Sequence, residues 1–527
     1  MTMSIRNVLF IMCDQLRRDH LGCYGHPTLR TRNIDALAAR GVRFDNAFVT
    51  SGVCGPSRMS FYTGRYVSSH GATWNRVPLS VGEITLGEYL KDSGRALALA
   101  GKTHVMPDNA NLKRLHLDGG TELEALLRSG HFTEVDRHDG HHAEPHSAYA
   151  DWLRAQGYDS RDPWTDYVIS AQAPDGEIVS GWQMRNAGLP ARVAEPHSET
   201  AYTVDRAMDY IATRGDDPWV LHLSLVKPHW PYLAPAPYHN VYSLDDCLPL
   251  QRDVGELEDP HPVVDAYRTQ EECVNFMRKE VSDTVRPAYQ GLIQQIDDRL
   301  GQLWELLERT GRWNDTLVVF TADHGDFLGD HWLGEKEQFY DTVQNIPLIV
   351  YDPSAEADAT RGAADARMVS AVDVVPTILD GLGLPAFDHR VEGRSLLDLT
   401  RGRGGGSGGN SAGWRDFVVS ELDYGYRGAR VALGRQPGEC RAWMVRDARW
   451  KYVHWQGFRP QLFDLANDPS EFVDLGADPG HEAVRSHMRG QLLDWFCTLK
   501  PRVTVSNAEV AAKTNVYKQA GVFFGVW

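Results

Sequence analysis

The residues best suited to chemistry in this chain gather around Cys54. Pro56 and Arg58 follow the cysteine at every second position. Proline is favoured in the first turn of a helix and glycine just past its end, so we expect a helix from Pro56 to Thr63 that stops at Gly64. A nucleophile at residue 54 would lie at the positive end of this helix dipole, and Arg58 would add a fixed positive charge one turn on.

Two other interpretations of Cys54 fit less well. A thiolate phosphatase loop would carry an arginine six residues after the cysteine, and that position holds Ser60. A buried structural cysteine fits the local stretch, but it leaves the polar residues described next without a role. The seven cysteines are scattered and odd in number, and their spacing matches neither a zinc site nor a disulfide framework.

Polar side chains also follow four apolar runs that we predict to be strands. They are Asp14-Gln15, Lys102 with His104, His229, and Asp323-His324. Ligands of open parallel sheets gather outside the carboxyl ends of the strands. We therefore expect these residues to share one site.

The two doublets that contain a carboxylate could bind a single divalent cation. Asp14, Gln15, Asp323 and His324 would supply carboxylate oxygens, an amide oxygen and an imidazole nitrogen. A set made only of oxygens would favour Ca²⁺ or Mg²⁺, whereas an imidazole moves the preference toward Mn²⁺. We expect one metal ion, Mn²⁺ first, with Ca²⁺ and Mg²⁺ as alternatives. The competing interpretation is that the doublets merely cap helices that follow the strands.

The elements that must position these residues alternate between short apolar runs and helical patterns. This order is typical of an α/β fold with a large, mainly parallel sheet sandwiched by helices. The predicted strands are Val8–Cys13, Ala96–Ala100, Trp219–Leu225, Leu317–Ala322 and Ile346–Tyr351. The predicted helices are Asn33–Arg40, Glu199–Thr213, Tyr289–Thr310 and Val372–Leu382.

The chain divides into a large and a small unit. Residues 1–400 are predicted to form the catalytic domain, and residues 401–413 are a Gly/Ser-rich loop at its boundary. Residues 414–499 are predicted to form a small α+β unit with an antiparallel sheet. Its expected elements are the strands Phe417–Ser420, Ala442–Arg446 and Trp450–His454 and the helix Glu482–Thr498. The tail, residues 500–527, ends in an apolar run, so we expect it to pack on the body or on a neighbouring subunit of a homo-oligomer.

Charge and hydropathy exclude two classes of partner. The formal charge is −17, from 71 acidic and 54 basic residues, which argues against nucleic-acid binding. No apolar run is long enough to span a bilayer, so no membrane association is expected. The run Val8–Cys13 is too short for the core of a secretory leader. The expected location is cytoplasmic.

Taken together, these motifs resemble the formylglycine-dependent sulfatases of the alkaline phosphatase superfamily, close to the arylsulfatases and phosphonate monoester hydrolases. The resemblance runs over nearly the whole length. It is carried by Asn7-Val8-Leu9-Phe10-Ile11-Met12 with Asp14, Gly22-Cys23-Tyr24-Gly25, the stretch from Cys54 to Arg65, Thr321-Ala322-Asp323-His324-Gly325, Leu328-Gly329-Asp330-His331 with Lys336, and Asp468-Pro469-Ser470-Glu471.

This resemblance implies a role for each candidate residue. Cys54 would be oxidised to formylglycine by a maturation enzyme, and its hydrate would be the nucleophile, held by Arg58. The residues implied around the sulfate are Lys102, His104, His229 and Lys336, with Asn75 as an extra contact. Asp14, Gln15, Asp323 and His324 would bind the metal. His229, or in its place Lys336, would protonate the leaving oxygen, and His104 would be the base in the second step.

The implied activity is hydrolysis of small-molecule sulfate monoesters, with release of sulfate and an alcohol or phenol. The Asp-Gln and Asp-His doublets depart from the common sulfatase metal set and resemble those of phosphonate and phosphodiester monoester hydrolases and choline sulfatases. Lys102 and His104 form the sulfatase-type pair, which favours sulfate esters. A phosphonate monoester or phosphodiester hydrolase, active on one or both classes, and a choline-sulfatase-like enzyme stay open as alternatives. So does a non-catalytic anion-binding protein.

Overall fold

The computed structural model describes residues 5–140, 146–403, 413–523 and 525. Its largest element is an eight-stranded sheet with the strand order β10-β2-β9-β8-β1-β7-β3-β4. The strands are β1 (Asn7–Asp14), β2 (Val42–Phe48), β3 (Leu97–Gly101), β4 (Phe132–Arg137), β7 (Val220–Pro228), β8 (Thr316–Ala322), β9 (Leu348–Tyr351) and β10 (Ala364–Ser370). All neighbours pair in parallel except β9, which is antiparallel to β2 and β8. The predicted mainly parallel sheet is confirmed.

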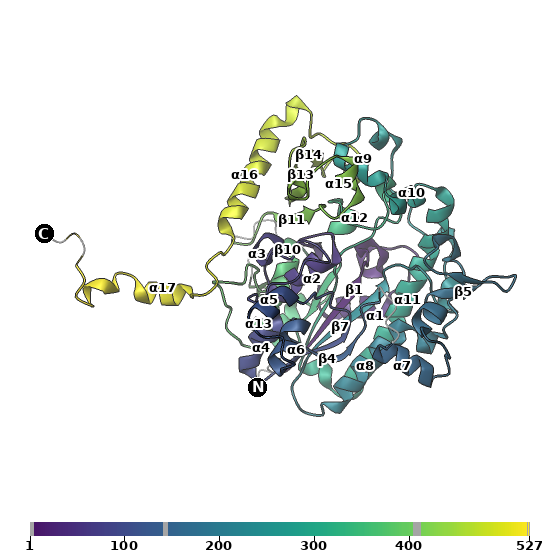
Figure 1. Cartoon of the computed structure of the whole chain (residues 1–527), viewed down its shortest axis with the longest axis horizontal. Helices are drawn as coiled ribbons and strands as arrows, with labels where there is room; N and C mark the ends of the chain where they lie inside the picture. Colours follow the sequence, from purple (N-terminus) through teal and green to yellow (C-terminus); the bar gives the residue numbers. More distant parts are fainter. Residues whose placement is uncertain (1–4, 141–145, 404–412, 524, 526–527) are drawn as a thin grey trace.

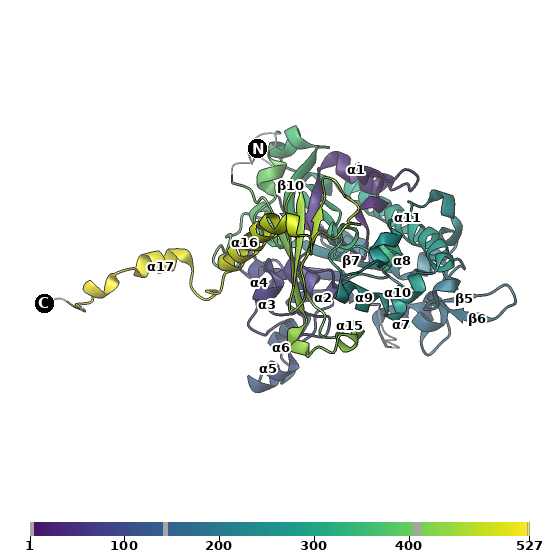
Figure 2. The same cartoon turned by 90° about the horizontal axis from the view of Figure 1, so that it is seen from above.

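Helices cover both faces of this sheet. Its central strands β1, β7 and β8 are therefore buried along their whole length. On one face, α8 (Glu199–Thr213) and α11 (Lys279–Arg309) pack on β7, and α1 (Arg32–Arg40) packs on α11. On the other, α13 (Val374–Gly381) lies against β8, α2 (Cys54–Thr63) and α4 (Leu86–Leu90). Figure 2 shows these two layers with the strands between them.

The register of the central strands brings the predicted polar residues to one edge of the sheet. Cys13 is level with Ala322 of β8, so Asp14 and Asp323 leave adjacent strands at the same height. On the other side of β1, Asp14 is level with Pro228, next to His229. Gly101, the residue before Lys102, is level with Ser224 of β7. Four strand ends therefore meet where the sequence predicts a site.

Two features of the large unit differ from the predictions. Helix α11 begins at Lys279 rather than near Tyr289, and it continues through Pro287. Proline removes one backbone hydrogen bond, but Val285 and Ala288 on either side of it are buried, and this packing keeps the helix intact. Strands β2, β4 and β10 of the large sheet were not predicted, because charged and polar residues interrupt their apolar positions.

The C-terminal unit contains the predicted antiparallel sheet, which has four strands where three were predicted. Its strands are β11 (Val418–Asp423), β12 (Arg441–Arg446), β13 (Trp450–Trp455) and β14 (Gln461–Asp464). Helix α16 (Glu482–Thr498) covers one face through Met488, Leu492 and Trp495. Residues 404–412 of the predicted Gly/Ser-rich loop lie outside the described residues, and the domain boundaries stay predictions.

A shared core joins the two units. Val53, Phe327 and Phe339 of the large unit are buried in one cluster with Leu422 and Trp455 of the small sheet. The fully buried Lys451 of β13 adds a polar tie, because its Nζ donates to the carbonyl of Phe339 at 2.8 Å and pairs with Asp341 at 2.6 Å. The small sheet therefore packs directly behind the loop that carries Lys336.

The tail runs out from the body. Asn507 still contacts the body, with Nδ2 3.3 Å from Oδ2 of Asp388. Helix α17 (Asn507–Lys513) then projects away from it (Figure 1). Tyr517 is 65% exposed and Phe523 is 60% exposed. These described tail residues do not pack on the body, and their packing on a neighbouring subunit stays a prediction. Phe524, Val526 and Trp527 of the apolar run are not among the described residues.

Across the described parts of the chain, none of the helices combines the length and the apolarity that crossing a bilayer requires.

Candidate active site

Helix α2 presents Cys54 at the edge of the sheet. It begins at Cys54, two residues earlier than predicted, and ends before Gly64, which adopts the expected left-handed conformation with φ 68°. The backbone N–H of Gly55 is not used within the helix and donates to Oδ1 of Asn75 at 2.7 Å. Asn75 thus covers the first turn of the helix beside Cys54.

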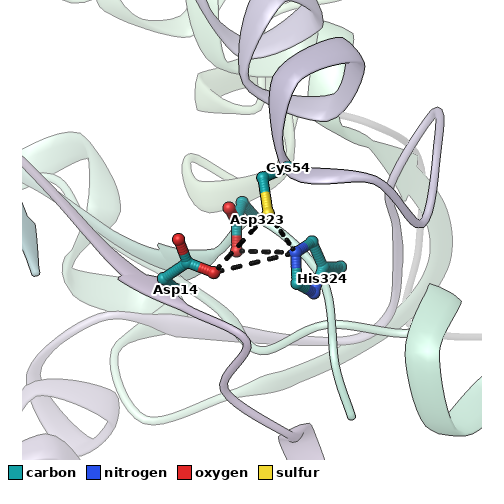
Figure 3. A group of neighbouring side chains, drawn as sticks. All are labelled: Asp14, Cys54, Asp323 and His324. Carbon is teal, nitrogen blue, oxygen red and sulfur yellow. Dashed lines mark hydrogen bonds and ion pairs between the residues drawn. The ribbon is translucent and has the colours of Figure 1, made fainter. Parts of the chain in front are cut away.

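Cys54 faces three side chains that can bind metal. The ligand atoms of Asp14, Cys54, Asp323 and His324 all lie within 4.8 Å of one another, and all four residues are buried. Figure 3 shows their side chains pointing to a common centre. Cys54 Sγ is 3.1 Å from His324 Nε2 and 3.9 Å from Asp14 Oδ1.

His324 is oriented for metal binding through Nε2. Its Nδ1 lies 2.9 Å from the carbonyl oxygen of Gly325, so this nitrogen carries the proton and donates. Burial, together with the charge of Lys336, lowers the pKa of His324 even though Asp323 and Asp14 oppose the shift. The neutral ring therefore presents a lone pair to the centre, which is the form that metals bind.

Two cations pair with the buried carboxylates. Arg58, itself fully buried, donates from Nε to Asp323 at 2.7 Å and from Nη2 to Asp14 at 3.2 Å. Lys102, also fully buried, forms an ion pair with Asp14. Burial alone would raise the pKa of Asp14, but Lys102, His229 and Arg58 hold it well below its usual range. Two ionised carboxylates and a neutral imidazole fit the donor set of one divalent metal ion.

The predicted residues Gln15, Lys336 and His229 form the next side of the site. Lys336 Nζ donates to Gln15 Oε1 at 3.2 Å and to His229 Nε2 at 2.8 Å. His229 Nδ1 lies 2.7 Å from the carbonyl oxygen of Trp230, so it is the donor and Nε2 is the acceptor. Burial would lower the pKa of Lys336, but the acidic groups around it, including Glu335, raise it. The ammonium therefore stays charged beside the imidazole.

Lys102 and His104 follow β3. Arg58 Nη1 donates to the carbonyl of Lys102 at 3.2 Å and to Oγ of Ser224 at 2.8 Å, which holds the end of β3 against the site. His104 is half-buried in a strained turn with φ 59°, where Asp139 accepts from its backbone N–H at 3.3 Å. A contact of His104 with the reacting atoms stays a prediction.

The Cys54 thiol has little nucleophilic character of its own. Burial and the charge of Asp14 raise its pKa to about 11, although Lys336 and Lys102 oppose this. The thiolate is the reactive form of cysteine, and this environment disfavours it.

Sequence reasoning missed the roles of Ser224, Asp139 and Asp326. Ser224 is a buried polar residue in the mostly apolar strand β7, and a buried polar group needs a hydrogen-bond partner. Asp326 follows His324 by two residues and accepts from Nε2 of Gln15 at 2.5 Å. Asp326 follows the end of β8, as Asp323 and His324 do, and this position could have indicated that it belongs to the site.

Comparison with known proteins identifies the family. The family model described as sulfatase matches residues 6–384. The chain belongs to the sulfatase family. A second model, the C-terminal region of N-sulphoglucosamine sulphohydrolase, matches residues 329–496.

Relatives and solved structures cover almost the whole chain. A multifunctional alkaline phosphatase superfamily protein, PehA of Trinickia caryophylli, is 31% identical over 94% of this chain and 95% of its own length. An arylsulfatase of Clostridium perfringens is 28% identical over 89% of this chain and 90% of its own. The crystal structure of a phosphonate monoester hydrolase of Agrobacterium radiobacter superposes with a TM-score of 0.80 at 28% identity, covering 93% of this chain and 95% of the other. The family and the alkaline phosphatase-like fold expected from the motifs are confirmed.

Proposed function

We propose that the protein hydrolyses sulfate monoesters, releasing inorganic sulfate and an alcohol or phenol. One observation carries this proposal: Cys54 Sγ belongs to a buried group of side chains that could hold a metal ion, and it lies 3.1 Å from Nε2 of His324. A nucleophile at residue 54 would therefore act on the same centre as the metal. The buried cations Arg58 and Lys102 beside it suit a substrate with a tetrahedral oxyanion.

Two additions to the chain are part of this proposal. Residue 54 acts as formylglycine, made from Cys54 by a maturation enzyme, as the resemblance to formylglycine-dependent sulfatases implies. Asp14, Gln15, Asp323 and His324 hold one divalent metal, Mn²⁺ in preference to Ca²⁺ or Mg²⁺ because of the imidazole. When bound, the metal polarises the sulfuryl oxygens and lowers the pKa of a nearby hydroxyl group.

In the first step, one hydroxyl of the aldehyde hydrate at residue 54 loses its proton to solvent, and its oxygen attacks sulfur in line. A new O–S bond forms as the S–O bond to the alcohol breaks. Lys102 and Lys336 offset charge on the equatorial oxygens, as positioned cations do in phosphoryl transfer. The leaving oxygen takes its proton from the hydrogen-bonded pair of His229 and Lys336.

In the second step, the other hydroxyl of the hydrate gives its proton to His104, which we propose as the base. The carbon–oxygen double bond re-forms, and the electron pair of the broken C–O bond leaves with sulfate. Water then adds to the aldehyde and restores the hydrate. A serine side chain has a single hydroxyl and lacks this route.

The second candidate is hydrolysis of phosphonate monoesters or phosphodiesters on the same site. The Asp-Gln and Asp-His doublets and the TM-score of 0.80 with the Agrobacterium radiobacter phosphonate monoester hydrolase favour it. The sulfatase-type pair of Lys102 and His104 favours sulfate. A choline-sulfatase-like preference is a narrower form of the first candidate. The choline-sulfatase of Rhizobium meliloti is 27% identical to this chain.

Turnover of nitrophenyl sulfate and of a phenyl phosphonate ester by the same preparation separates the candidates. We expect the larger kcat/KM for the sulfate ester. A larger kcat/KM for the phosphonate ester would make phosphonate hydrolysis the first candidate and sulfate hydrolysis the second. Mass spectrometry of the Cys54 peptide is the control for both, and an unmodified thiol after coexpression with a maturation enzyme would favour a non-catalytic anion-binding protein.

A further inference from the structure

The side-chain amide of Gln15 has two ends, and only one of them can bind a cation. An amide oxygen carries lone pairs, whereas the amide nitrogen is a donor. Gln15 is fully buried, and its amide lies between Lys336 on one side and Asp326 with Tyr232 on the other. Whatever orients this amide therefore decides whether residue 15 is a ligand.

Asp326 and Tyr232 both present acceptors to the amide nitrogen. Oδ2 of Asp326 lies 2.5 Å from Nε2 of Gln15 and accepts the hydroxyl of Tyr232 at 2.6 Å. Because the Tyr232 proton points to Asp326, its oxygen is free to accept from Nε2 of Gln15 at 3.3 Å. The other oxygen of Asp326 accepts the backbone N–H of Leu328 at 3.0 Å, so the carboxylate itself is held in place.

The opposite side of the amide meets a donor. Lys336 Nζ lies 3.2 Å from Oε1 of Gln15. A turned amide would set its N–H groups against this ammonium and its oxygen against a carboxylate, and both contacts would be repulsive. The backbone of Gln15 is fixed separately, by the hydroxyl of Tyr289 on its carbonyl at 2.6 Å and by Asp323 on its N–H at 3.0 Å.

We infer that Asp326 and Tyr232 are positioning residues, which hold Gln15 with its amide oxygen toward the metal. Neither needs to touch the substrate or the metal. The inference rests on the proposed metal site. It assigns a role to a buried aspartate that the reaction steps above do not use.

A second Gln-Asp-Tyr group on the protein surface supplies a matched control. Asp298 accepts from Nε2 of Gln294 at 2.9 Å and from the hydroxyl of Tyr238 at 2.7 Å. This group has the same three residue types and the same two hydrogen bonds, but it lies at the surface, where Asp298 is exposed and Gln294 and Tyr238 are half-buried. Gln294 and Asp298 are on α11, and Tyr238 is in the short 3-10 helix Tyr238–Asn240. Asp298→Asn and Tyr238→Phe therefore repeat the chemical changes without affecting Gln15.

The experiment measures Mn²⁺ affinity by isothermal titration, after metal has been removed from the purified protein. In Asp326→Asn the new amide can donate as well as accept, so the side-chain amide of Gln15 can rotate and exchange the places of its oxygen and nitrogen. We expect Mn²⁺ to bind roughly ten- to a hundredfold more weakly, as is usual when a group behind a metal ligand is lost. Tyr232→Phe should weaken binding by a few-fold, and the two surface variants should bind Mn²⁺ like the unaltered protein.

A double variant tests orientation directly. Gln15→Glu combined with Asp326→Asn keeps one carboxylate and one amide but exchanges their places. The Glu at position 15 then has an oxygen where Gln15 has Oε1 and another where it has Nε2. The Asn amide at position 326 can donate to the second of these oxygens. Affinity for Mn²⁺ should recover at least to the value of the unaltered protein.

Equal Mn²⁺ affinity in Asp326→Asn and the unaltered protein would overturn the inference, as would failure of the double variant to recover. If Asp326→Asn does not fold, Tyr232→Phe decides in its place, since it removes one oxygen and keeps the ring. Unaltered protein that binds no Mn²⁺ would instead overturn the metal site, and this inference with it. The two failures are thereby distinguished.

Discussion

His324 and Cys54 are in direct contact, with Nε2 of the imidazole 3.1 Å from the sulfur. The other ring nitrogen is occupied by the carbonyl of Gly325 at 2.9 Å. The imidazole therefore offers its one free lone pair to the point that residue 54 faces. This contact joins residues 270 positions apart in the chain and brings the proposed nucleophile next to the proposed metal ligand.

Cys54→Ser should arrest the reaction after its first step. A serine hydroxyl can attack sulfur, but it lacks the second hydroxyl whose loss of a proton expels sulfate. We expect one turnover at most, with intact-protein mass spectrometry showing one added sulfuryl group. Repeated turnover at the rate of the unaltered enzyme would contradict the mechanism.

Removal of metal should abolish activity. Asp14, Asp323 and His324 converge on one centre, and in the proposed mechanism the ion held there polarises the substrate. Dialysis against a chelator, followed by titration with Mn²⁺, Ca²⁺ and Mg²⁺ in separate samples, checks this. We expect Mn²⁺ to restore activity best. Full activity in protein from which elemental analysis detects no metal would be incompatible with the proposed site.

Lys102→Met should reduce kcat/KM for a sulfate ester by about a hundred- to a thousandfold, the usual cost of losing one positioned charge in a closed site. The side chain keeps its length but loses the ammonium that pairs with Asp14. Lys279→Met, on a side chain that is 72% exposed, is the matched control and should leave kcat/KM unchanged. A similar loss of kcat/KM in both variants would show that Lys102 has no specific role in the reaction.

Buried histidines should make the protein less stable in mild acid. His70 accepts the backbone N–H of Ala72 at Nδ1, and burial together with Arg65 lowers its pKa to about 3. An unfolded histidine has a pKa near 6.5, so the unfolded chain binds the extra proton first, and stability is present above that pH and lost as the pH falls. For His70 this amounts to about 2 kcal/mol of unfolding free energy between pH 7 and pH 5.

Urea unfolding at pH 7 and pH 5 measures this effect. In His70→Gln the loss between the two pH values should be smaller than in the unaltered protein by about 2 kcal/mol. His487 is exposed, and His487→Gln should lose as much stability as the unaltered protein. The same loss in both variants would mean that His70 does not titrate as its environment indicates.

Removing the tail should change the assembly and leave the fold intact. We propose that the projecting segment docks on a neighbouring subunit, because Tyr517 and Phe523 are mostly exposed in the single chain. A chain that ends at Ser506 should show a lower mass in light scattering after size-exclusion chromatography, with an unchanged circular dichroism spectrum. An unchanged mass would show that the tail does not hold subunits together.

The sequence predicted best the elements whose environment is uniform. Strands β1, β7 and β8 are buried on both faces and therefore read as apolar runs, and α8 has the predicted bounds. The start of α11 was missed because tertiary packing outweighs the local effect of Pro287. Strand β2 was missed because only some of its residues are buried.

In the candidate site, too, some features could be predicted from the sequence and others depend on tertiary packing. Residues at strand ends could be grouped in advance, since parallel strands bring their carboxyl ends together. The contacts of Lys336 could not, because they depend on the path of an irregular loop. In that loop Leu328, His331, Trp332, Glu335 and Glu337 all have positive φ. Such a path is imposed by neighbours distant in the sequence and has no periodicity of its own.

The shared core of the two units limits how this enzyme can be re-engineered. Lys451 and the cluster around Trp455 support the backbone just beyond Lys336, so the small sheet is a wall of the catalytic unit and not an appended module. A chimaera that takes its C-terminal sheet from a relative would need the matching loop from the same donor. The two segments form one exchangeable block, although more than a hundred residues separate Phe339 from Lys451.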